Sequence, residues 1–180
     1  MNLTGISQKR EMIIKLFLDP LAALPYLPSS GTVLDIGSGA GVPGLPLKIA
    51  RPEFEVHLLE SRAKKVSFLK DMIRRLDLEG IEACRGRAEE RADLPTLLHC
   101  YDIVTVRALA PLGETITLCS RYLEPGSLLV TYKGSKVDRE LEDSRRLMEE
   151  QNLRISKRLP YSLPETQGKR YLLILKKGTN

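Results

Sequence analysis

The sequence predicts an open α/β fold built on a twisted, mostly parallel sheet with a C-terminal antiparallel hairpin. Apolar runs typical of buried strands alternate with amphipathic segments of helical period, which is the pattern of successive βα units. The first apolar run ends in a glycine-rich turn at residues 37–44. Near the C-terminus, two strand-like runs are joined by a link too short for a helical crossover, so we expect them to pair antiparallel.

The elements follow in a regular order along the chain. Parallel strands are expected at residues 33–36, 56–60, 81–84, 101–106 and 127–132. Helices are expected at residues 43–50, 64–76 and 112–123, with a charged surface helix at 135–151. The closing hairpin is expected at residues 155–161 and 170–176. These elements form one α/β domain over residues 31–180.

An N-terminal helical segment is expected over residues 1–30. Residues 9–18 have helical spacing, with Met12, Ile13, Leu16 and Phe17 on one face. Asp19-Pro20 is expected to end or bend this helix, because proline lacks the backbone N–H that a helix interior needs. A second short helix is expected over residues 21–27.

The glycine-rich turn is the strongest candidate for a ligand site. Gly37, Gly39 and Gly41 can adopt backbone angles that other residues avoid, and they let a ligand approach the main chain. The N-terminus of the following helix offers unpaired N–H groups. We therefore expect a flat, polar ligand to lie over this turn.

Two ligand classes use such a turn. Residues 39–44 fit G-x-G-x-x-G, and Glu60 stands about 20 residues further on, where a dinucleotide site has its ribose-binding acid. Residues 35–41 also fit D-x-G-x-G-x-G, and Asp35 suits an ammonium or sulfonium group but would repel a pyrophosphate. Charge complementarity therefore favours S-adenosylmethionine over NAD. A tight βα corner with Asp35 capping the helix is the simpler alternative, but three alternating glycines exceed what a corner needs.

Composition sets broad limits on the protein class. The chain has 180 residues, 42% of them hydrophobic, which suits one domain with a sizeable core. Its apolar runs are all shorter than the ~18–20 residues of a transmembrane helix, so we expect a cytoplasmic protein with no membrane partner. Its cysteines and histidines are widely spaced, so we expect reduced thiols and no metal site; they are Cys84, Cys100, Cys119, His57 and His99.

Basic residues point to an anionic partner. The formal net charge is +5 and the isoelectric point about 9.2. Lysine and arginine cluster near predicted strand ends and loops, where they could neutralise phosphates of a nucleic acid. The clusters are Arg62/Lys64/Lys65, Arg85/Arg87/Arg91, Lys133/Lys136/Arg139 and Lys169/Arg170. A merely solvated basic surface is the alternative.

Ligands of open α/β sheets bind beyond the carboxyl ends of the parallel strands. In this sequence those ends carry acids suited to an adenosine-bearing cofactor and bases suited to an anionic substrate. They are Asp35/Gly37, Glu60, Arg85–Glu89, Arg107 and Lys133. Arg107 is the most informative of them, because an arginine after four apolar strand residues is hard to place on an ordinary solvated face.

Several motifs spread along essentially the whole chain follow the pattern of one known family. The motifs are Asn2-Leu3-Thr4, residues 35–47, Leu59-Glu60-Ser61, residues 64–69, Arg87-Ala88-Glu89, Val106-Arg107-Ala108, Lys133-Gly134 and Gly168-Lys169-Arg170. Together they resemble the RsmG family, also called glucose-inhibited division protein B, of guanine-N7 methyltransferases acting on bacterial 16S ribosomal RNA. Gly-Xaa-Pro-Gly-Leu-Pro after the cofactor turn is the most specific part of the resemblance.

The resemblance implies a Rossmann-like class I S-adenosylmethionine-dependent methyltransferase fold, with S-adenosylhomocysteine as the product. Gly37, Val42, Ala88, Glu89 and Arg107 fall on the family's cofactor-contact positions, and Glu60 falls on its ribose position. With Asp35, Gly39 and Gly41 of the turn, these are the expected cofactor-binding residues. Lys64, Lys133 and Arg170 would face the RNA. The partner would be 16S ribosomal RNA or the small ribosomal subunit, and the protein would act as a monomer.

The sequence departs from the family pattern at two places. Family members usually have a helical segment before Asn-Leu-Thr, and here that motif is at residues 2–4, so part of the cofactor lid or RNA platform is expected to be missing. Where the family has His-Xaa-Leu-Asp-Ser, this chain has Leu16-Phe17-Leu18-Asp19-Pro20.

Methylation of guanine N7 would fit the candidate residues. N7 holds a lone pair and no proton, so alignment of the reactants can supply most of the catalysis without a base. Arg107 beside the cofactor is then the candidate catalytic residue. A non-catalytic RNA-binding relative, a small-molecule methyltransferase and an NAD-dependent oxidoreductase remain as alternatives, although the last would need a substrate domain and a proton donor.

Overall fold

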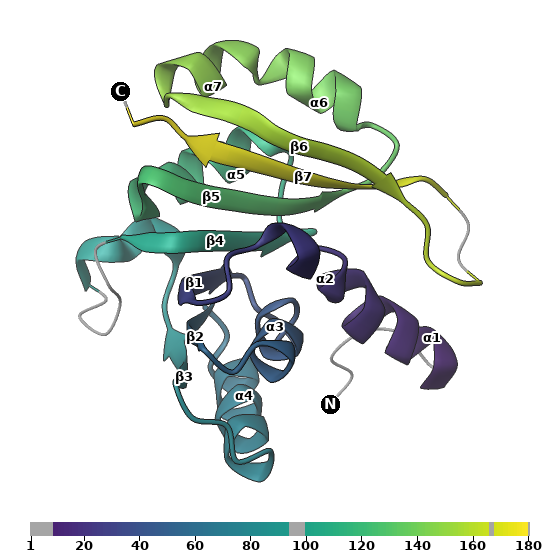
Figure 1. Cartoon of the computed structure of the whole chain (residues 1–180). Coiled ribbons are helices and arrows are strands. Elements are labelled where there is room, and N and C mark those ends of the chain that lie inside the picture. Colours follow the sequence, from purple (N-terminus) through teal and green to yellow (C-terminus); the bar gives the residue numbers. More distant parts are fainter. Residues whose placement is uncertain (1–8, 94–99, 166–167, 180) are drawn as a thin grey trace.

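The computed structural model describes residues 9–93, 100–165 and 168–179. Its centre is a seven-stranded sheet in the order β3-β2-β1-β4-β5-β7-β6. The strands are β1 (Gly31–Ile36), β2 (Phe54–Glu60), β3 (Ile81–Arg85), β4 (Tyr101–Arg107), β5 (Leu123–Lys133), β6 (Leu153–Tyr161) and β7 (Arg170–Lys177). The first five pair parallel, whereas β7 lies antiparallel between β5 and β6 (Figure 1). The predicted fold class is confirmed.

Helices cover both faces of the sheet (Figure 1). On one face lie α5 (Leu112–Cys119), α6 (Val137–Asp143) and α7 (Arg145–Glu150). The other face carries α3 (Gly44–Ala50), α4 (Ala63–Arg75) and the N-terminal segment. Shorter 3₁₀ turns are η3 (Ala88–Asp93) and η4 (Ser120–Tyr122). The sheet is therefore buried on both sides, as a mostly parallel sheet requires.

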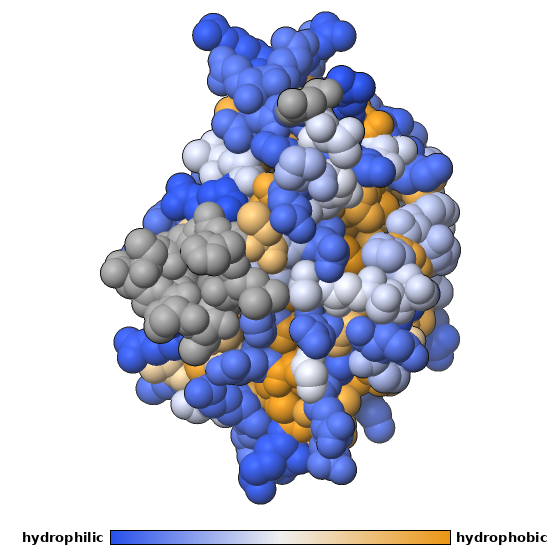
Figure 2. All heavy atoms as spheres, turned by 60° about the vertical axis from the view of Figure 1, so that its left-hand side comes forward, coloured by the Kyte–Doolittle hydropathy of each residue, from blue (hydrophilic) through white to orange (hydrophobic). Residues whose placement is uncertain are grey.

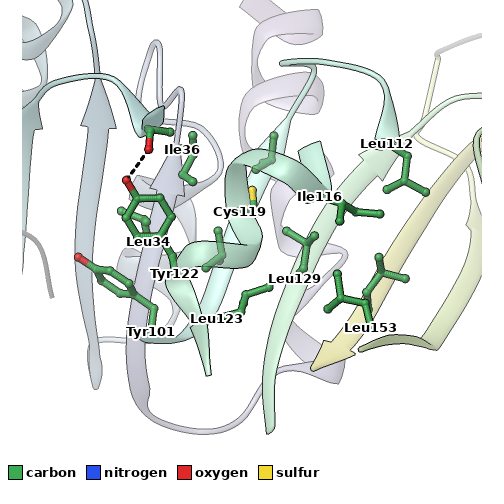
Figure 3. Close-up of a cluster of buried hydrophobic side chains, with 14 of the residues drawn as sticks. Leu34, Ile36, Tyr101, Leu112, Ile116, Cys119, Tyr122, Leu123, Leu129 and Leu153 are labelled. Atoms are coloured by element: carbon green, nitrogen blue, oxygen red, sulfur yellow. Dashed lines mark hydrogen bonds between the residues drawn. The ribbon is translucent and has the colours of Figure 1, made fainter. Parts of the chain in front are cut away.

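Alternating strand residues supply the two halves of the core. Leu34, Val104 and Leu129 pack against α5 and α7, whereas Val33, Ile103 and Val130 pack toward α3 and α4. Figure 3 shows the first half, in which Tyr122 and Tyr101 lie among leucine side chains. The Tyr122 hydroxyl donates a hydrogen bond of 2.8 Å to the Ala88 carbonyl. The core thus fixes the backbone that follows β3.

The N-terminal segment differs from the predicted helix that ends at Asp19-Pro20. Helical backbone continues through α1 (Lys9–Ile13), a π-helical turn η1 (Ile14–Leu18) and α2 (Asp19–Leu21), with a 3₁₀ turn η2 (Leu24–Tyr26) after it. Pro20 lies in the first turn of α2, where a missing N–H is tolerated. Ile13 and Phe17 from the predicted apolar face are 46% exposed, whereas Ile14 is buried.

Two other boundaries also differ from the sequence prediction. The helix expected over residues 112–123 ends at Cys119, and β5 begins at Leu123, so Pro125-Gly126 lies inside the strand at a register shift against β4. The surface helix expected over residues 135–151 is divided at Ser144, which is buried. Asn2-Leu3-Thr4, residues 94–99 with His99, and part of the hairpin link lie outside the described residues.

The face shown in Figure 2 is largely hydrophilic where it is coloured, with hydrophobic patches between the polar side chains. Exposed large apolar residues are scattered singly or in pairs, as on most globular proteins. In the described ranges, every helix is too short or too polar to cross a bilayer.

Candidate functional site

The glycine-rich turn follows β1 directly. Gly37, Gly39 and Gly41 have φ of +73°, +58° and +86°, which is the left-handed region that glycine enters without strain. The backbone N–H groups of Gly37 and Ser38 donate to the Leu59 carbonyl at 2.9 and 3.2 Å. The turn is therefore attached to the end of β2, and the predicted glycine conformations are confirmed.

Asp35 lies beneath this turn and is fully buried. Its carboxylate accepts the Gly44 backbone N–H at 3.0 Å and the Thr105 hydroxyl at 3.2 Å. Burial raises the pKa of this carboxyl to about 6. The Asp35 carboxylate thus binds the start of α3, as expected for a tight βα corner in which Asp35 caps the helix. Asp35 is not part of the lining of the crevice at the turn. The predicted contact between Asp35 and a ligand stays a prediction, and the contacts seen here are those of a carboxylate that supports the turn.

Glu60 is the acid that faces the crevice. One carboxylate oxygen, Oε2, accepts the Gly39 N–H at 3.1 Å and lies 3.7 Å from Lys65 Nζ, while Oε1 accepts the Arg62 N–H at 2.9 Å. Its side chain is only 7% exposed. The turn and the start of α4 therefore hold this carboxylate in one orientation, at the place where the sequence predicts a ribose-binding acid.

A cavity of about 480 Å³ opens at the carboxyl ends of β1, β2 and β4. It brings together most of the predicted cofactor residues: Gly37, Glu60, Ala88, Glu89 and Arg107. Asp35, Gly39, Gly41 and Val42 lie outside this lining. The Gly41 and Val42 N–H groups bond to the Ser38 carbonyl at 2.7 and 2.9 Å, so these two residues shape the turn.

The loop between β4 and α5 closes one side of the cavity. Ala108, Leu109 and Ala110 line it. A Cβ built on Gly37 would lie 3.0 Å from Leu109 Cδ1, so Leu109 is in close contact with the glycine turn. Sequence reasoning did not single out Leu109, since no local pattern brings residues 72 positions apart into contact.

Arg107 ends β4 and lines the same cavity. Its side chain is 18% exposed, and its Nε lies 3.3 Å from Asp19 Oδ2. The sequence indicates Asp19 as a helix boundary and as part of the stretch of residues 16–20 that departs from the family pattern. Its side chain is in fact fully buried against the carboxyl end of the sheet, and nothing in its sequence neighbourhood indicates an ion pair with Arg107.

The three predicted RNA residues differ in their surroundings. Lys64 is exposed on α4, beside the cavity residues Arg62 and Lys65. Lys133 Nζ contacts Glu140 Oε2 at 2.8 Å and the Ala110 carbonyl at 3.1 Å. Arg170 Nη1 contacts Asp19 Oδ2 at 2.8 Å. Only Lys64 therefore presents an amino group without a partner among the described residues.

A second cavity of about 260 Å³ shares the wall formed by residues 108–110. It lies between the ends of β4 and β5, and Thr131, Lys133 and Glu140 are part of its lining. Glu140 Oε2 also accepts the Leu112 N–H at 2.8 Å. The Lys133–Glu140 pair thus holds the loop that separates the two cavities.

Replacing Gly44 by alanine should destabilise the start of α3. A Cβ there would lie 2.3 Å from Leu58 Cδ2 and 3.0 Å from Asp35 Oδ2, and both side chains are buried. Overpacking of this kind costs about 1–3 kcal/mol of unfolding free energy, which urea denaturation would measure. Gly134→Ala is the control, because nothing lies within 4 Å of its Cβ. Equal stabilities of the two variants would contradict the predicted clash.

Comparison with known proteins gives one consistent family. The family model described as GidB, rRNA small subunit methyltransferase G, matches residues 1–167. The ribosomal RNA small subunit methyltransferase G of Lachnoclostridium phytofermentans is 40% identical over 179 residues, covering 98% of this chain and 74% of that protein. The corresponding protein of Xanthomonas euvesicatoria is 36% identical over 177 residues, covering 98% and 79%.

Solved structures show the same fold at low identity. A methyltransferase from Pyrococcus furiosus has a TM-score of 0.67 at 15% identity, covering 88% of this chain and 83% of its own. M. jannaschii TYW2, solved in complex with AdoMet, has a TM-score of 0.68 at 12% identity, covering 96% and 77%. The seven-stranded, mostly parallel sheet described above therefore has the fold of these methyltransferases. The chain belongs to the rRNA small subunit methyltransferase G family.

Proposed function

We propose that this protein transfers a methyl group from S-adenosylmethionine to N7 of a guanine in 16S ribosomal RNA. Family membership identifies it as a methyltransferase that acts on small-subunit ribosomal RNA, and it disfavours the NAD-dependent oxidoreductase. The observation that carries the finer proposal is the single cavity in which Gly37, Glu60, Ala88, Glu89 and Arg107 converge.

The residues of this cavity fit S-adenosylmethionine. Its volume of about 480 Å³ suits a ligand of that size. Its lining carries carboxylates at Glu60, Glu89 and Glu114 and cations at Arg62, Lys65, Arg87 and Arg107. Such a mixed lining suits a ligand that combines ribose hydroxyls, an ammonium group, a carboxylate and a sulfonium. When bound, the cofactor would supply an activated methyl group.

Each residue of the cavity then has a defined task. The Glu60 carboxylate, held by the Gly39 N–H, would accept hydrogen bonds from the ribose hydroxyls. Ala88 and Glu89 would border the adenine side, and Ala88 is held in place by the Tyr122 hydroxyl. Arg107 would orient the reacting end through its guanidinium. Asp35, Gly41 and Val42 would act indirectly, by shaping the turn and the start of α3.

The target base would enter through the second cavity, beside the loop of residues 108–110. Guanine N7 needs no deprotonation, so the protein has only to align the base with the methyl group and exclude water.

We further propose that residues 31–180 form the methyltransferase domain and residues 1–30 an N-terminal helical segment. The described part of that segment packs on the domain, with the Tyr132 hydroxyl donating to the Pro20 carbonyl at 2.8 Å. We also propose that the protein acts as a monomer in the cytoplasm. Its substrate would be 16S RNA or the small ribosomal subunit, which agrees with the ribosomal RNA named in the family description.

Mapping of 7-methylguanine tests the proposal directly. Borohydride and aniline cleave RNA at this nucleotide, so 16S RNA from cells with and without the gene should differ by one cleavage product. Purified protein with S-adenosylmethionine should restore the cleavage in RNA or subunits from the deletion strain. Binding of RNA without restored cleavage would favour the non-catalytic relative.

Replacing Lys64 by alanine should weaken RNA binding without affecting the cofactor. Loss of one phosphate contact should lower the slope of log K against log salt by about 0.7–0.9. Fluorescence anisotropy over a salt series would measure it. Lys70→Ala is the matched control, because Lys70 is exposed on α4 six residues further on and therefore on a different side of the helix. Identical salt slopes for both variants would remove Lys64 from the RNA surface.

A further inference from the structure

We propose that Asp19 is a positioning residue of the cofactor site, and that it acts by holding Arg107 in the crevice. The N-terminal segment would then contribute a residue that positions Arg107 in the cofactor site. The inference rests on the proposed function only for the identity of the ligand, because the contacts that carry it are present in the protein alone.

Asp19 lies at the start of α2 and has no exposed surface. Its Oδ2 lies 3.3 Å from Arg107 Nε and 2.8 Å from Arg170 Nη1, and its Oδ1 accepts a short hydrogen bond from the Tyr161 hydroxyl. These partners end β4, begin β7 and end β6. One carboxylate therefore joins three strands at the carboxyl edge of the parallel sheet.

The two arginines need this carboxylate. Both guanidinium groups contact the same oxygen, so without its charge two like charges would stand close together in a largely buried place. Breaking a buried ion pair leaves an uncompensated charge, which is strongly unfavourable. Arg107 would then have to turn its guanidinium toward solvent, away from the position seen here.

The contact with Asp19 leaves most of Arg107 available to a ligand. The ion pair is closest at Nε, 3.3 Å from Asp19 Oδ2, and Nε carries one of the five N–H bonds of a guanidinium. Among residues 9–93, 100–165 and 168–179, the terminal amino groups of Arg107 have no ion-pair partner closer than this one, so they can face a ligand carboxylate or phosphate. Asp19 thus fixes the orientation of the Arg107 side chain, and the guanidinium can still contact a ligand in the cavity.

The position of Asp19 is itself set by packing on the sheet. The Tyr132 hydroxyl holds the adjacent Pro20 carbonyl, and Ala23 and Leu27 are buried in the core beside Val130 and Tyr132. The carboxylate is therefore carried by a docked segment of backbone. The residues that hold this backbone, Tyr132 and Val130 among them, lie outside the crevice lining.

The test is a double-mutant cycle in the full chain, with S-adenosylhomocysteine as the probe in isothermal titration calorimetry. Asp19→Asn should raise its dissociation constant at least about tenfold, as expected for loss of a charge-assisted contact that orients Arg107. In an Arg107→Ala background, the same change should add less than about twofold. Additive losses would show that Asp19 does not act through Arg107, and unchanged binding by Asp19→Asn would also overturn the proposal.

Tyr161→Phe is the control variant. It removes one hydrogen bond to the same carboxylate but leaves the charge and both arginines, so binding should stay within about twofold to threefold of wild type. A loss as large as that of Asp19→Asn would indicate a general packing effect and would contradict the proposal.

A measurement on the unaltered protein covers the case in which Asp19→Asn does not fold. The Arg107 Nε–H signal, assigned by its absence in Arg107→Lys, should be protected from hydrogen exchange without any ligand. Rapid exchange would overturn the proposal. Failure of the wild type to bind S-adenosylhomocysteine would instead count against the proposed function. In that case the exchange measurement would still test whether Asp19 holds Arg107.

Discussion

Arg107→Ala is expected to lower methyl transfer to 16S ribosomal RNA by about 100-fold or more while the chain remains folded. Arg107 ends β4 and lines the cavity beside the loop of residues 108–110. Removing it takes away the group that would orient the reacting end of the cofactor. Transfer of radiolabelled methyl groups from S-adenosylmethionine to undermethylated RNA would measure the loss.

A distant arginine controls for the general loss of positive charge. Arg154 is exposed on the edge strand β6, so Arg154→Ala should keep the transfer rate close to that of wild type. Circular dichroism and thermal unfolding should show that Arg107→Ala has a native fold. Full turnover by this variant would reject the role of Arg107.

Asp35→Asn is expected to make the protein more stable at pH 8, by up to about 3 kcal/mol at about 1.4 kcal/mol per pKa unit. Burial raises the pKa of Asp35 from 3.8 to about 6, so the folded state holds its proton more tightly than the unfolded chain does. The associated stability is present below about pH 4 and is lost as the pH rises through about 6. Asparagine is neutral at every pH in this range, so the variant should not lose this stability as the pH rises.

Urea denaturation at several pH values between 4 and 8 would measure the unfolding free energy of both proteins. Between these values the wild type should lose stability relative to Asp35→Asn as the pH rises. Asp71→Asn is a control of opposite sign, because hydrogen bonding to Arg74 lowers the pKa of that exposed carboxyl. It should not gain stability at pH 8. S-adenosylhomocysteine should still bind Asp35→Asn, since the carboxylate faces Gly44 and Thr105. A less stable variant at pH 8 would contradict the predicted cost of burying this charge.

The order of strands and helices could be predicted because each depends on a local pattern. The glycine turn requires positive φ, and glycine is the residue that adopts it without strain. The link of residues 162–169 is too short for a crossover, so β6 and β7 had to pair antiparallel. Arg107 could be singled out because it follows a buried strand at the edge where such folds bind ligands.

The N-terminal segment could not be predicted in the same way. Its helical spacing suggested an apolar face containing Ile13 and Phe17, yet both are half exposed and the segment is held instead by Ile14, Asp19 and Pro20. The π-helical turn before Asp19 changes which side chains face the sheet. Asp35 shows the same limit, because its motif did not reveal whether the carboxylate faces a ligand or the start of α3.

The sequence by itself determined the α/β fold class, the glycine turn over which a ligand would lie, and the strand ends where Glu60 and Arg107 meet. Repeating periods and backbone preferences act between near neighbours, so they can be recognised without coordinates. Only the tertiary structure decided that Asp35 supports the turn and that Asp19 pairs with Arg107 and Arg170. Those contacts join residues far apart in the chain, and the packing of whole elements on the sheet brings them together.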